Sequence, residues 1–350
     1  MRGSGKTVLV CRLSALGDVA MTIPVIYSAA RENPDTRFVM LTSKRIKEIF
    51  INTPANLEVI GIKKDKYKGL GGTIRLFREV RKQVGFNAFA DLHSVIRTHL
   101  FGAICRLRGI KTARIDKGRN EKRALTRHAA KAVKQLKSGF DRSREVFERL
   151  GIAVGDNFEH LSPEVDPSKY SAVIPPKRDG ERWIGIAPFA AHEGKVYPRT
   201  QMETVINVLA STPNFRIILF GGKKREEVVL TQWEEKYDNA VSIAGKGLDL
   251  ATELAIQSQL DVMVSMDSAN MHLASLVGTP VVSVWGATHP YCGFGGWRQP
   301  DDNAIGLALD CRPCSVYGNK PCRRKDLFCL YGIRPQTIID KIFSILNANS

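Results

Sequence analysis

The chain has 350 residues, which is long enough for two domains of ordinary size. Its hydrophobic fraction of 43% and charged fraction of 25% are typical of a soluble globular protein. No stretch approaches the roughly 18 consecutive apolar residues that a membrane-spanning helix needs. The short polar segment before the first apolar run does not have the pattern of a signal peptide. We therefore expect a cytoplasmic protein.

The net charge of +17 is concentrated in the first half of the chain. Residues 1–150 contain 32 Lys and Arg against 13 Asp and Glu, whereas residues 151–350 contain 20 against 22. The densest part lies between Arg106 and Arg149. A surface of this kind attracts nucleic acid, an anionic membrane, or a phosphorylated or carboxylated substrate. A solvated helix face explains any single basic residue equally well.

Strand and helix patterns alternate through the first half. Residues 8–13, 37–41, 57–62 and 88–92 are short apolar runs that predict buried strands, and residues 18–32 and 71–83 have helical periodicity. This alternation predicts a parallel sheet covered by helices.

A second alternating series follows a proline-rich stretch at residues 162–182, which we interpret as an interdomain connection. Its predicted strands are residues 183–188, 215–222, 240–245, 261–267 and 280–286. Its predicted helices are residues 200–210, 226–237, 250–258, 269–276 and 335–347. Two doubly wound α/β domains are the expected fold class. Open sheets of this kind bind ligands outside the carboxyl ends of their strands, so we expect an active site between the two domains.

Two familiar phosphate-binding patterns are excluded. The segment Gly3–Thr7 resembles the end of a P-loop, but it precedes the first strand instead of following one, and the upstream glycine is missing. No G-x-G-x-x-G follows either leading strand, which disfavours a nicotinamide or flavin dehydrogenase.

The first candidate site follows the first strand, in the sequence Arg12-Leu-Ser-Ala-Leu-Gly-Asp18. Gly17 permits a tight turn, and Asp18 lies where the next helix begins. An acidic residue there can be a helix cap. Alternatively, Asp18 projects from the strand end as a general base for an acceptor hydroxyl.

The second candidate site lies where a strand runs into Asp267-Ser268 and a helix begins at Ala269. The free amides of a helix N-terminus suit a diphosphate. Asp267 can bind sugar or ribose hydroxyls. His272 is either a packed helix histidine or a site residue. A third candidate is Lys195, which follows the strand at residues 183–188 and can neutralise phosphate oxygens.

Together these segments resemble the heptosyltransferase family that builds lipopolysaccharide cores. The opening R-L-S-x-L-G-D-V, with Thr22 and Pro24, and the later D-S-x-x-x-H-L-A with G-T-P-V-V and W-G-x-T-x-P carry the resemblance, which covers nearly the whole chain. It implies a GT-B fold and transfer from an ADP-heptose donor, inverting the anomeric centre without a metal or other cofactor.

The resemblance also implies roles for individual residues. Asp18 is the expected catalytic base, and Lys195 contacts the donor diphosphate. Asp267, Ser268, Ala269 and His272 bind the donor, with Glu226 or Glu227 near the ribose and Leu248 near the adenine. The positive charge of the first half has a use in such an enzyme. We expect it to contact an acidic lipid or oligosaccharide acceptor through Arg119, Arg123 and Arg127, with peripheral attachment to an anionic membrane surface.

The expected domains are residues 1–165 for the acceptor and 180–332 for the nucleotide sugar. A final helix at 333–350 is expected to pack back toward the N-terminal domain.

Four cysteines, Cys311, Cys314, Cys322 and Cys329, are crowded near the C-terminus. The first pair has the C-x-x-C spacing of zinc sites, but the second pair is more widely spaced than such sites prefer. A structural zinc site, reduced thiols and a local disulfide remain alternatives, and we assign the cluster a structural role.

Two other functions remain open. One is a GT-B transferase with another nucleotide-sugar donor or a protein acceptor, and the other is a non-catalytic protein that binds polyanions. Nucleic acid is disfavoured as a partner because no aromatic residue for base stacking lies between Arg106 and Lys137.

Overall fold

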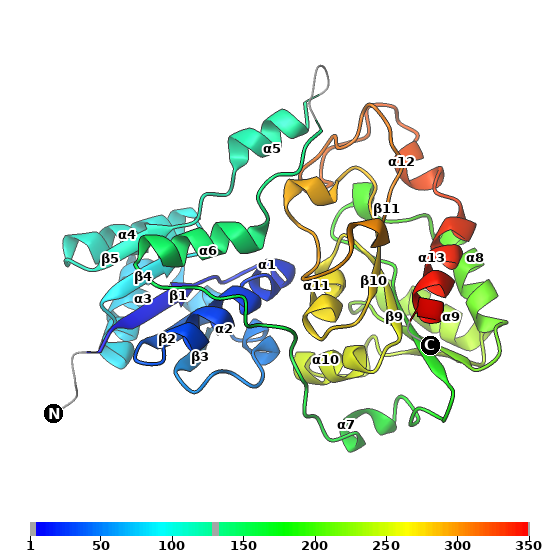
Figure 1. Ribbon diagram of the computed structural model, residues 1–350, viewed down its shortest axis with the longest axis horizontal. Coiled ribbons are helices and arrows are strands. Elements are labelled where there is room, and N and C mark those ends of the chain that lie inside the picture. The colour runs from blue at the N-terminus through cyan, green and yellow to red at the C-terminus, as the bar shows by residue number, and fades with distance from the viewer. Residues whose placement is uncertain (1–4, 128–132, 349–350) are drawn as a thin grey trace. The chain divides into compact units, whose positions relative to one another are not determined.

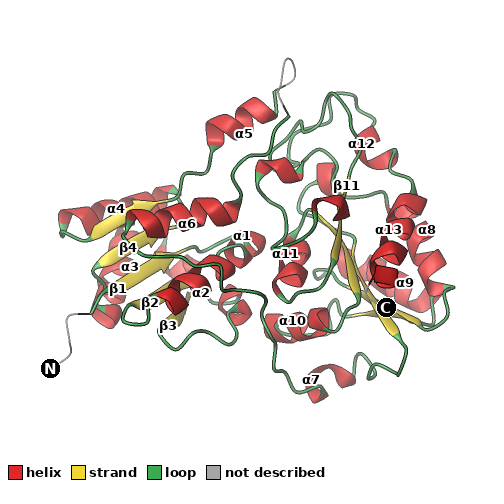
Figure 2. Ribbon diagram, in the orientation of Figure 1, coloured by secondary structure: helices red, strands yellow, loops and turns green. Residues whose placement is uncertain are grey.

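The computed structural model describes residues 5–127 and 133–348. The chain forms two compact units (Figure 1). Unit 1 comprises Met1–Arg119 and Lys137–His160, and unit 2 comprises Asn120–Leu136 and Leu161–Ser350. Each unit holds one sheet of parallel strands with helices packed on it (Figure 2). The predicted fold class is confirmed.

The sheet of unit 1 has the strand order β3-β2-β1-β4-β5. Its strands are β1 (Thr7–Cys11), β2 (Arg37–Ser43), β3 (Leu57–Ile62), β4 (Ala88–Asp91) and β5 (Lys111–Arg114). The order runs outward from β1 to β3 and then reverses, so that β4 pairs with the other side of β1. The point between β1 and β4 is therefore the topological switch point, where open α/β sheets bind ligands.

Helices cover both faces of this sheet. The helical segments are α1 (Leu16–Ala20), α2 (Ile23–Glu32), η1 (Ile46–Ile49), η2 (Lys64–Tyr67), α3 (Gly69–Val84), α4 (Ile96–Leu107) and α6 (Gly139–Arg149), while α5 (Arg119–Leu125) begins at the boundary of the two units. One face buries Phe77 of α3 and Phe101 of α4. On β2, the side chain of Phe38 lies on the opposite face of the sheet and packs on Phe147 of α6. Successive side chains of a strand point to opposite faces of the sheet.

Two parts of this region differ from the prediction. The single helix expected at residues 18–32 is divided into α1 and α2 around Met21 and Thr22. Pro24 lies in the first turn of α2, where its missing N–H costs no hydrogen bond, so a new helix begins there. Helices α4 and α6 and strand β5 were not predicted.

The sheet of unit 2 has the order β11-β10-β9-β6-β7-β8. Its strands are β6 (Arg182–Ala187), β7 (Phe215–Leu219), β8 (Ala240–Ser242), β9 (Val262–Met266), β10 (Val281–Val284) and β11 (Ala304–Ile305). Its helical segments are α7 (Ser168–Ser171), η3 (Glu193–Lys195), α8 (Arg199–Ala210), α9 (Arg225–Lys236), α10 (Leu250–Ser258), α11 (Ala269–Leu276), η4 (Pro290–Cys292), η5 (Asp301–Asn303), α12 (Phe328–Tyr331) and α13 (Pro335–Ala348). The switch point of this sheet lies between β6 and β9.

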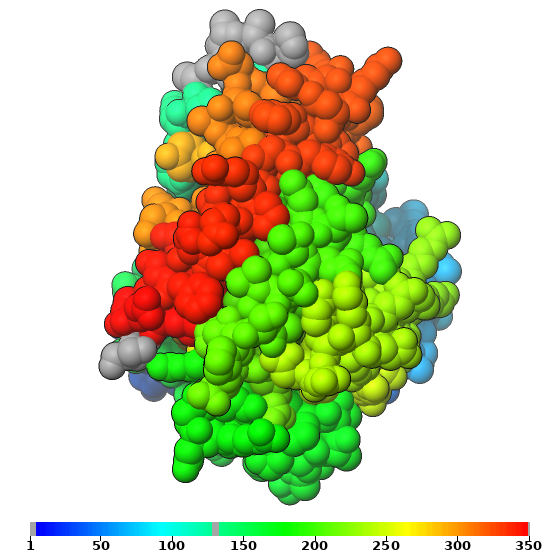
Figure 3. Space-filling view, turned by 90° about the vertical axis from the view of Figure 1, so that its right-hand side faces the viewer, coloured from blue at the N-terminus to red at the C-terminus, as the bar shows by residue number. Residues whose placement is uncertain are grey.

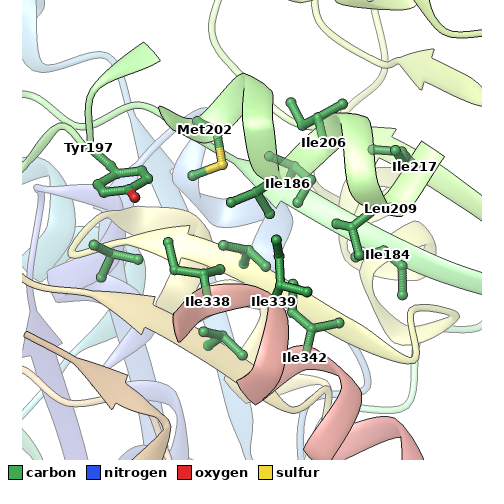
Figure 4. Packing of buried hydrophobic residues seen from close by; sticks show 14 of the residues in the cluster. Ile184, Ile186, Tyr197, Met202, Ile206, Leu209, Ile217, Ile338, Ile339 and Ile342 are labelled. Atoms are coloured by element: carbon green, nitrogen blue, oxygen red, sulfur yellow. The ribbon is translucent and has the colours of Figure 1, made fainter. Parts of the chain in front are cut away.

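The C-terminal helix α13 is part of the core of unit 2. Ile338, Ile339 and Ile342 pack with Met202 and Ile206 of α8 over the strands of the sheet (Figure 4). On the surface, α13 runs beside α8 (Figure 3). Its apolar face is thus buried within unit 2, and the expected packing toward the N-terminal domain stays a prediction.

Two segments belong to unit 2 for reasons that their sequences did not reveal. Residues 162–182, expected to be a connection, bury Tyr170 and Ile174 in a cluster with Trp183 on the face that α10 and α11 also cover. Residues 120–136, expected in the N-terminal domain, bury Leu125 and Leu136 against Cys292.

Among the described residues, no helix is both long and apolar enough to span a bilayer.

Candidate active site

The switch point of unit 2 holds a buried ion pair. Lys195 Nζ lies 2.8 Å from Asp267 Oδ2, and the two side chains are only 14% and 5% exposed. Lys195 follows β6 and Asp267 follows β9, the two strands on either side of the switch point. Both were predicted from sequence, and the structure brings them together.

Two other residues predicted to bind the nucleotide sugar follow β7 and β8, the strands beyond β6 in the sheet. Glu226 lies in the first turn of α9 after β7, and Leu248 follows β8. Because β9, β6, β7 and β8 are consecutive neighbours, these residues all lie along the carboxyl edge of one sheet. Glu226 Oε2 accepts a hydrogen bond of 2.6 Å from the Gly222 amide, and Glu227 Oε2 accepts one of 3.2 Å from the Lys224 amide. Both carboxylates thus order the loop that enters α9.

Helix α11 begins beside the ion pair. Ser268 is its N-terminal cap residue, and Ala269 is its first residue. Ser268 makes no capping bond with its side chain, and its Oγ lies 3.2 Å from Ser265 Oγ. The first amides of a helix carry partial positive charge, so together with Lys195 they form a site suited to an anion. His272 is 6% exposed and lies among the buried residues of α11.

Gly318 packs closely against the side chain of Lys195. Gly318 has a φ of +73°, and a Cβ at this position would lie 2.6 Å from Lys195 Cγ. Two features therefore require glycine at this position. One is the backbone conformation, and the other is the close approach of the Lys195 methylene chain. Gly318 was not predicted from the sequence, because its contact with Lys195 joins segments far apart in the chain.

In unit 1, Asp18 lies at the carboxyl end of β1 and is paired with Arg12. Arg12 Nη2 is 2.8 Å from Asp18 Oδ2, and the aspartate side chain is 37% exposed. The same carboxylate accepts a hydrogen bond of 3.3 Å from the Ala15 amide at the start of α1. Asp18 therefore caps the helix, as one of the two interpretations predicts, and its side chain remains partly exposed to solvent. Its role as a general base stays a prediction.

A pocket of about 680 Å³ opens at the switch point of unit 1. Its wall contains the basic side chains of Lys64, Arg97 and Arg119, together with His93 and His99. Leu13, Ser14, Ser94, Val95 and Ile96 complete the lining. Ser14 follows β1 and His93 follows β4, the strands that flank the switch point. The charge and position of this pocket suit an anionic ligand.

His93 is held in this pocket as a neutral imidazole. Burial, with the positive charges of Arg12, Lys117 and Lys64, lowers the pKa of His93 to about 4, although Asp18 acts in the opposite direction. Its Nε2 lies 3.5 Å from Ser14 Oγ. The turn is set by the buried Asp91, whose Oδ1 accepts hydrogen bonds from the His93 and Ser94 amides at 3.0 and 2.8 Å.

His93, Lys64, Arg97 and Lys117 were not among the residues predicted from the sequence. A polar His93-Ser94 pair directly after the strand AFADL was the available signal, but its importance depends on β4 pairing with β1. Burial, with Arg12 and Arg119 nearby, also lowers the pKa of Lys117.

The three arginines predicted to bind the acceptor lie in different units. Arg119 lines the pocket of unit 1, whereas Arg123 and Arg127 belong to unit 2. The same segment is fastened to unit 2 by Lys122, whose ammonium lies 4.0 Å from the centre of the Phe294 ring. Their contact with an acceptor stays a prediction.

The four clustered cysteines line one small cavity of unit 2, together with Arg127, Lys320, Arg323 and Arg324. They are free thiols, and burial raises the pKa of Cys329 to about 11. Within residues 5–127 and 133–348, no three His, Cys, Asp or Glu side chains are arranged to hold a metal ion. The loop is fastened by the buried Arg312, which donates to Gly286 O at 2.6 Å and to Thr288 O at 3.1 Å. The zinc interpretation stays a prediction.

Residues 114–323 match glycosyltransferase family 9 (heptosyltransferase). The chain belongs to this family. It is therefore a glycosyltransferase, as its sequence motifs predicted, and its two parallel-sheet units are those of the GT-B fold.

Individual relatives are distant in sequence. Lipopolysaccharide heptosyltransferase 1 of Campylobacter coli is 23% identical over 303 residues, which cover 81% of this chain and 85% of the relative. Among solved structures, a family 9 glycosyltransferase from Veillonella parvula superposes with a TM-score of 0.77 at 17% identity, covering 99% of both chains. The E. coli heptosyltransferase WaaC with ADP superposes with a TM-score of 0.64 at 17% identity, covering 97% of this chain and 99% of that one. The two superpositions agree with the GT-B fold.

Proposed function

We propose that this family 9 enzyme transfers heptose from ADP-heptose to an acceptor of the lipopolysaccharide core, with inversion at the anomeric carbon. The observation that carries the proposal is the Lys195–Asp267 pair at the switch point of unit 2, beside the N-terminus of α11. Similarity to relatives named lipopolysaccharide heptosyltransferases, and to a structure that contains ADP, supports the choice of substrates.

Unit 2 is the proposed donor domain. An ammonium group has three protons, so Lys195 can donate to Asp267 and to a diphosphate oxygen at the same time. Asp267 holds the lysine in place, and Ser268 and Ala269 offer backbone amides to the same diphosphate. As the bond between the anomeric carbon and the diphosphate breaks, negative charge grows on the leaving oxygen, where these donors stabilise it. Glu226 and Leu248 lie further along the edge for the nucleoside, and His272 supports α11.

Unit 1 is the proposed acceptor domain, with Asp18 as the general base. The acceptor hydroxyl attacks the anomeric carbon from the face opposite the diphosphate and transfers its proton to Asp18. An aspartate is a weak base, with an ordinary pKa of about 3.9. Positioning of the hydroxyl therefore supplies a large part of the rate enhancement. Arg12 orients the carboxylate through its 2.8 Å contact.

An acidic acceptor fits the pocket of unit 1. Lys64, Arg97 and Arg119 supply positive charge, while neutral His93 can exchange a hydrogen bond with a sugar hydroxyl. Because core acceptors are attached to lipid, the enzyme would work in the cytoplasm at the inner membrane surface. Its partners would be the nucleotide sugar and the acidic lipid, and not nucleic acid.

The proposal is tested by incubating the purified protein with ADP-heptose and heptose-deficient core lipids and detecting the transferred sugar by mass spectrometry. ADP should raise the thermal unfolding temperature more than UDP or GDP does. A preference for UDP or GDP would indicate another donor for the same fold. Stabilisation by none of the three nucleotides, without transfer, would favour a non-catalytic polyanion-binding protein.

A further inference from the structure

Two aliphatic side chains are exposed at the carboxyl edge of the sheet in unit 1. Ile96 is 89% exposed at the start of α4, and Leu70 is 62% exposed in the first turn of α3. Helix α3 follows β3 and α4 follows β4, and all strands of this sheet are parallel. Both helices therefore begin at the same edge, and their packing on one face of the sheet keeps them beside each other.

Cations surround these two residues. Exposed lysines occupy four of the seven positions before Leu70, namely Lys63, Lys64, Lys66 and Lys68. Arg97 follows Ile96 directly, and Arg119 lies in the same pocket wall as Ile96 and Lys64. Asp65 is the acidic residue among the lysines, and it pairs with Lys68 at 3.6 Å on the surface. The edge thus combines strong positive charge with projecting aliphatic groups.

That combination fits the surface of an anionic bilayer. Aliphatic side chains gain free energy by entering the region between headgroups and acyl chains, and each nearby Lys or Arg adds attraction to acidic lipids. Lysine stems can also lie along apolar surface while their ammonium groups stay at the headgroups.

The position of the pocket argues for the same partner. Its lining residues follow β1, β3, β4 and β5 at this edge, and Ile96 is one of them. A lipid-linked acceptor presents its sugar head at the membrane surface, so the pocket that receives it must open there. This step rests on the proposed function.

We infer that the carboxyl edge of the sheet in unit 1 docks on an anionic membrane, with Ile96 and Leu70 entering the headgroup region as anchors. The enzyme then meets its acceptor by diffusing along the bilayer, while Lys63, Lys66 and Lys68 lie on the lipid phosphates.

The opposite end of α4 provides a matched control. Leu107 is 87% exposed and is flanked by Arg106 and Arg108, but it lies at the amino edge of the sheet, away from the pocket. A general affinity of exposed aliphatic and basic residues for lipid predicts equal effects at both ends. The inference predicts an effect at the Ile96 end.

The test is co-sedimentation of the full chain with phosphatidylcholine vesicles, with and without phosphatidylglycerol. Wild type and Leu107→Ser should bind the vesicles that contain phosphatidylglycerol equally well. Ile96→Ser and Leu70→Ser should each weaken binding by about tenfold, as expected for losing the burial of one aliphatic side chain. Thermal unfolding of each variant confirms that the fold is kept. Absence of wild-type binding, or equal losses in Ile96→Ser and Leu107→Ser, would overturn the inference.

Transfer assays separate this inference from the proposed function. With a delipidated, water-soluble acceptor, Leu70→Ser should match the wild-type rate, whereas its transfer to acceptor in vesicles should fall. If the wild type fails to use the soluble acceptor while the vesicle-binding differences hold, the proposed reaction is wrong and the docking edge stands. If Leu70→Ser is unimpaired with vesicle acceptor, the anchor role of Leu70 is wrong even though the reaction is right.

Discussion

Arg12 and Asp18 form an ion pair of 2.8 Å across the loop that joins β1 to α1, and the same carboxylate accepts the Ala15 amide. Asp18 is therefore a helix cap and a candidate base at once. A substitution must separate these roles, because loss of a cap alone changes stability, whereas loss of a base changes the rate.

Asp18→Asn should lower kcat by about a hundredfold or more, the usual contribution of a general base, while ADP binding stays at the wild-type level. The asparagine keeps much of the capping ability, so the fold should persist. Steady-state transfer kinetics measure the effect. Asp141→Asn is the control, because Asp141 accepts the Ser138 amide at the start of α6 in the same arrangement. Equal kcat values for Asp18→Asn and Asp141→Asn would remove Asp18 from catalysis.

Lys195→Met should weaken ADP binding by about tenfold or more, the effect of losing a hydrogen bond to a charged group. It should also destabilise the protein by about 3–5 kcal/mol, because Asp267, which is 5% exposed, loses its counter-charge. Adding Asp267→Asn should restore part of the stability but not the ADP affinity. Calorimetric titration and thermal unfolding measure the two effects.

Lys177→Met is the control. It removes a 2.7 Å pair with Asp261 at the amino edge of the sheet and should leave ADP binding unchanged. An equal loss of ADP affinity in Lys177→Met would show that Lys195→Met weakens ADP binding only by destabilising the protein.

Gly318→Ala should weaken ADP binding because its Cβ would displace the stem of Lys195. Gly180→Ala is the matched variant, because Gly180 precedes β6 at the amino edge of the sheet. Its φ is +72°, so the backbone cost is similar, but a Cβ there meets nothing within 4 Å. Each variant should lose about 1 kcal/mol of stability from backbone strain. Comparable ADP affinities in the two variants would mean that the position of Lys195 does not depend on Gly318.

The free energy of unfolding should fall as the pH is lowered from about 6.5 to 4, and His93 should contribute to this loss. The folded-state pKa of His93 is lowered to about 4 from 6.5 by burial and by Arg12. Within that window the unfolded chain binds the extra proton, so acid favours unfolding. His289, with a pKa also lowered to about 4 by burial, adds to the same slope. In His93→Gln the pH dependence should be shallower. An imidazole NMR titration that places His93 near 6.5 would contradict this account.

Lys64→Ala, Arg97→Ala and Arg119→Ala should each raise the KM for an acidic acceptor by about threefold to tenfold and leave the KM for the donor unchanged. A charged hydrogen bond is the interaction lost in each case. Kinetics at fixed donor concentration test this. Arg78→Ala on the exposed side of α3 provides the comparison, and an equal rise in KM there would indicate long-range attraction instead of binding in the pocket.

The sequence alone determined much of this protein. Buried strands and amphipathic helices have periods that can be read along the chain, so the long helices α8, α9, α10, α11 and α13 and the strands β6, β9 and β10 were predicted to within two residues. Asp18, Lys195 and Asp267 were found because each lies at the end of an apolar run or in the loop that follows it, and the carboxyl end of a parallel strand is where ligands bind. Asp18 pairs with the nearby Arg12, whereas the contact between Lys195 and Asp267 depends on the pairing of β6 with β9.

Strand order and packing between distant segments decided the rest. His93 joins Ser14 in one pocket because β4 pairs with β1, which lies 80 residues earlier in the register Val8 to Ala88. Gly318 is needed because Lys195 packs against it, and residues 120–136 join unit 2 because Leu125 and Leu136 bury against Cys292. No local pattern encodes these contacts, since they depend on which of many apolar surfaces meet when the sheets assemble. The physical reason is that hydrophobic burial has no direction, and the partner of each surface is settled only by the packed whole.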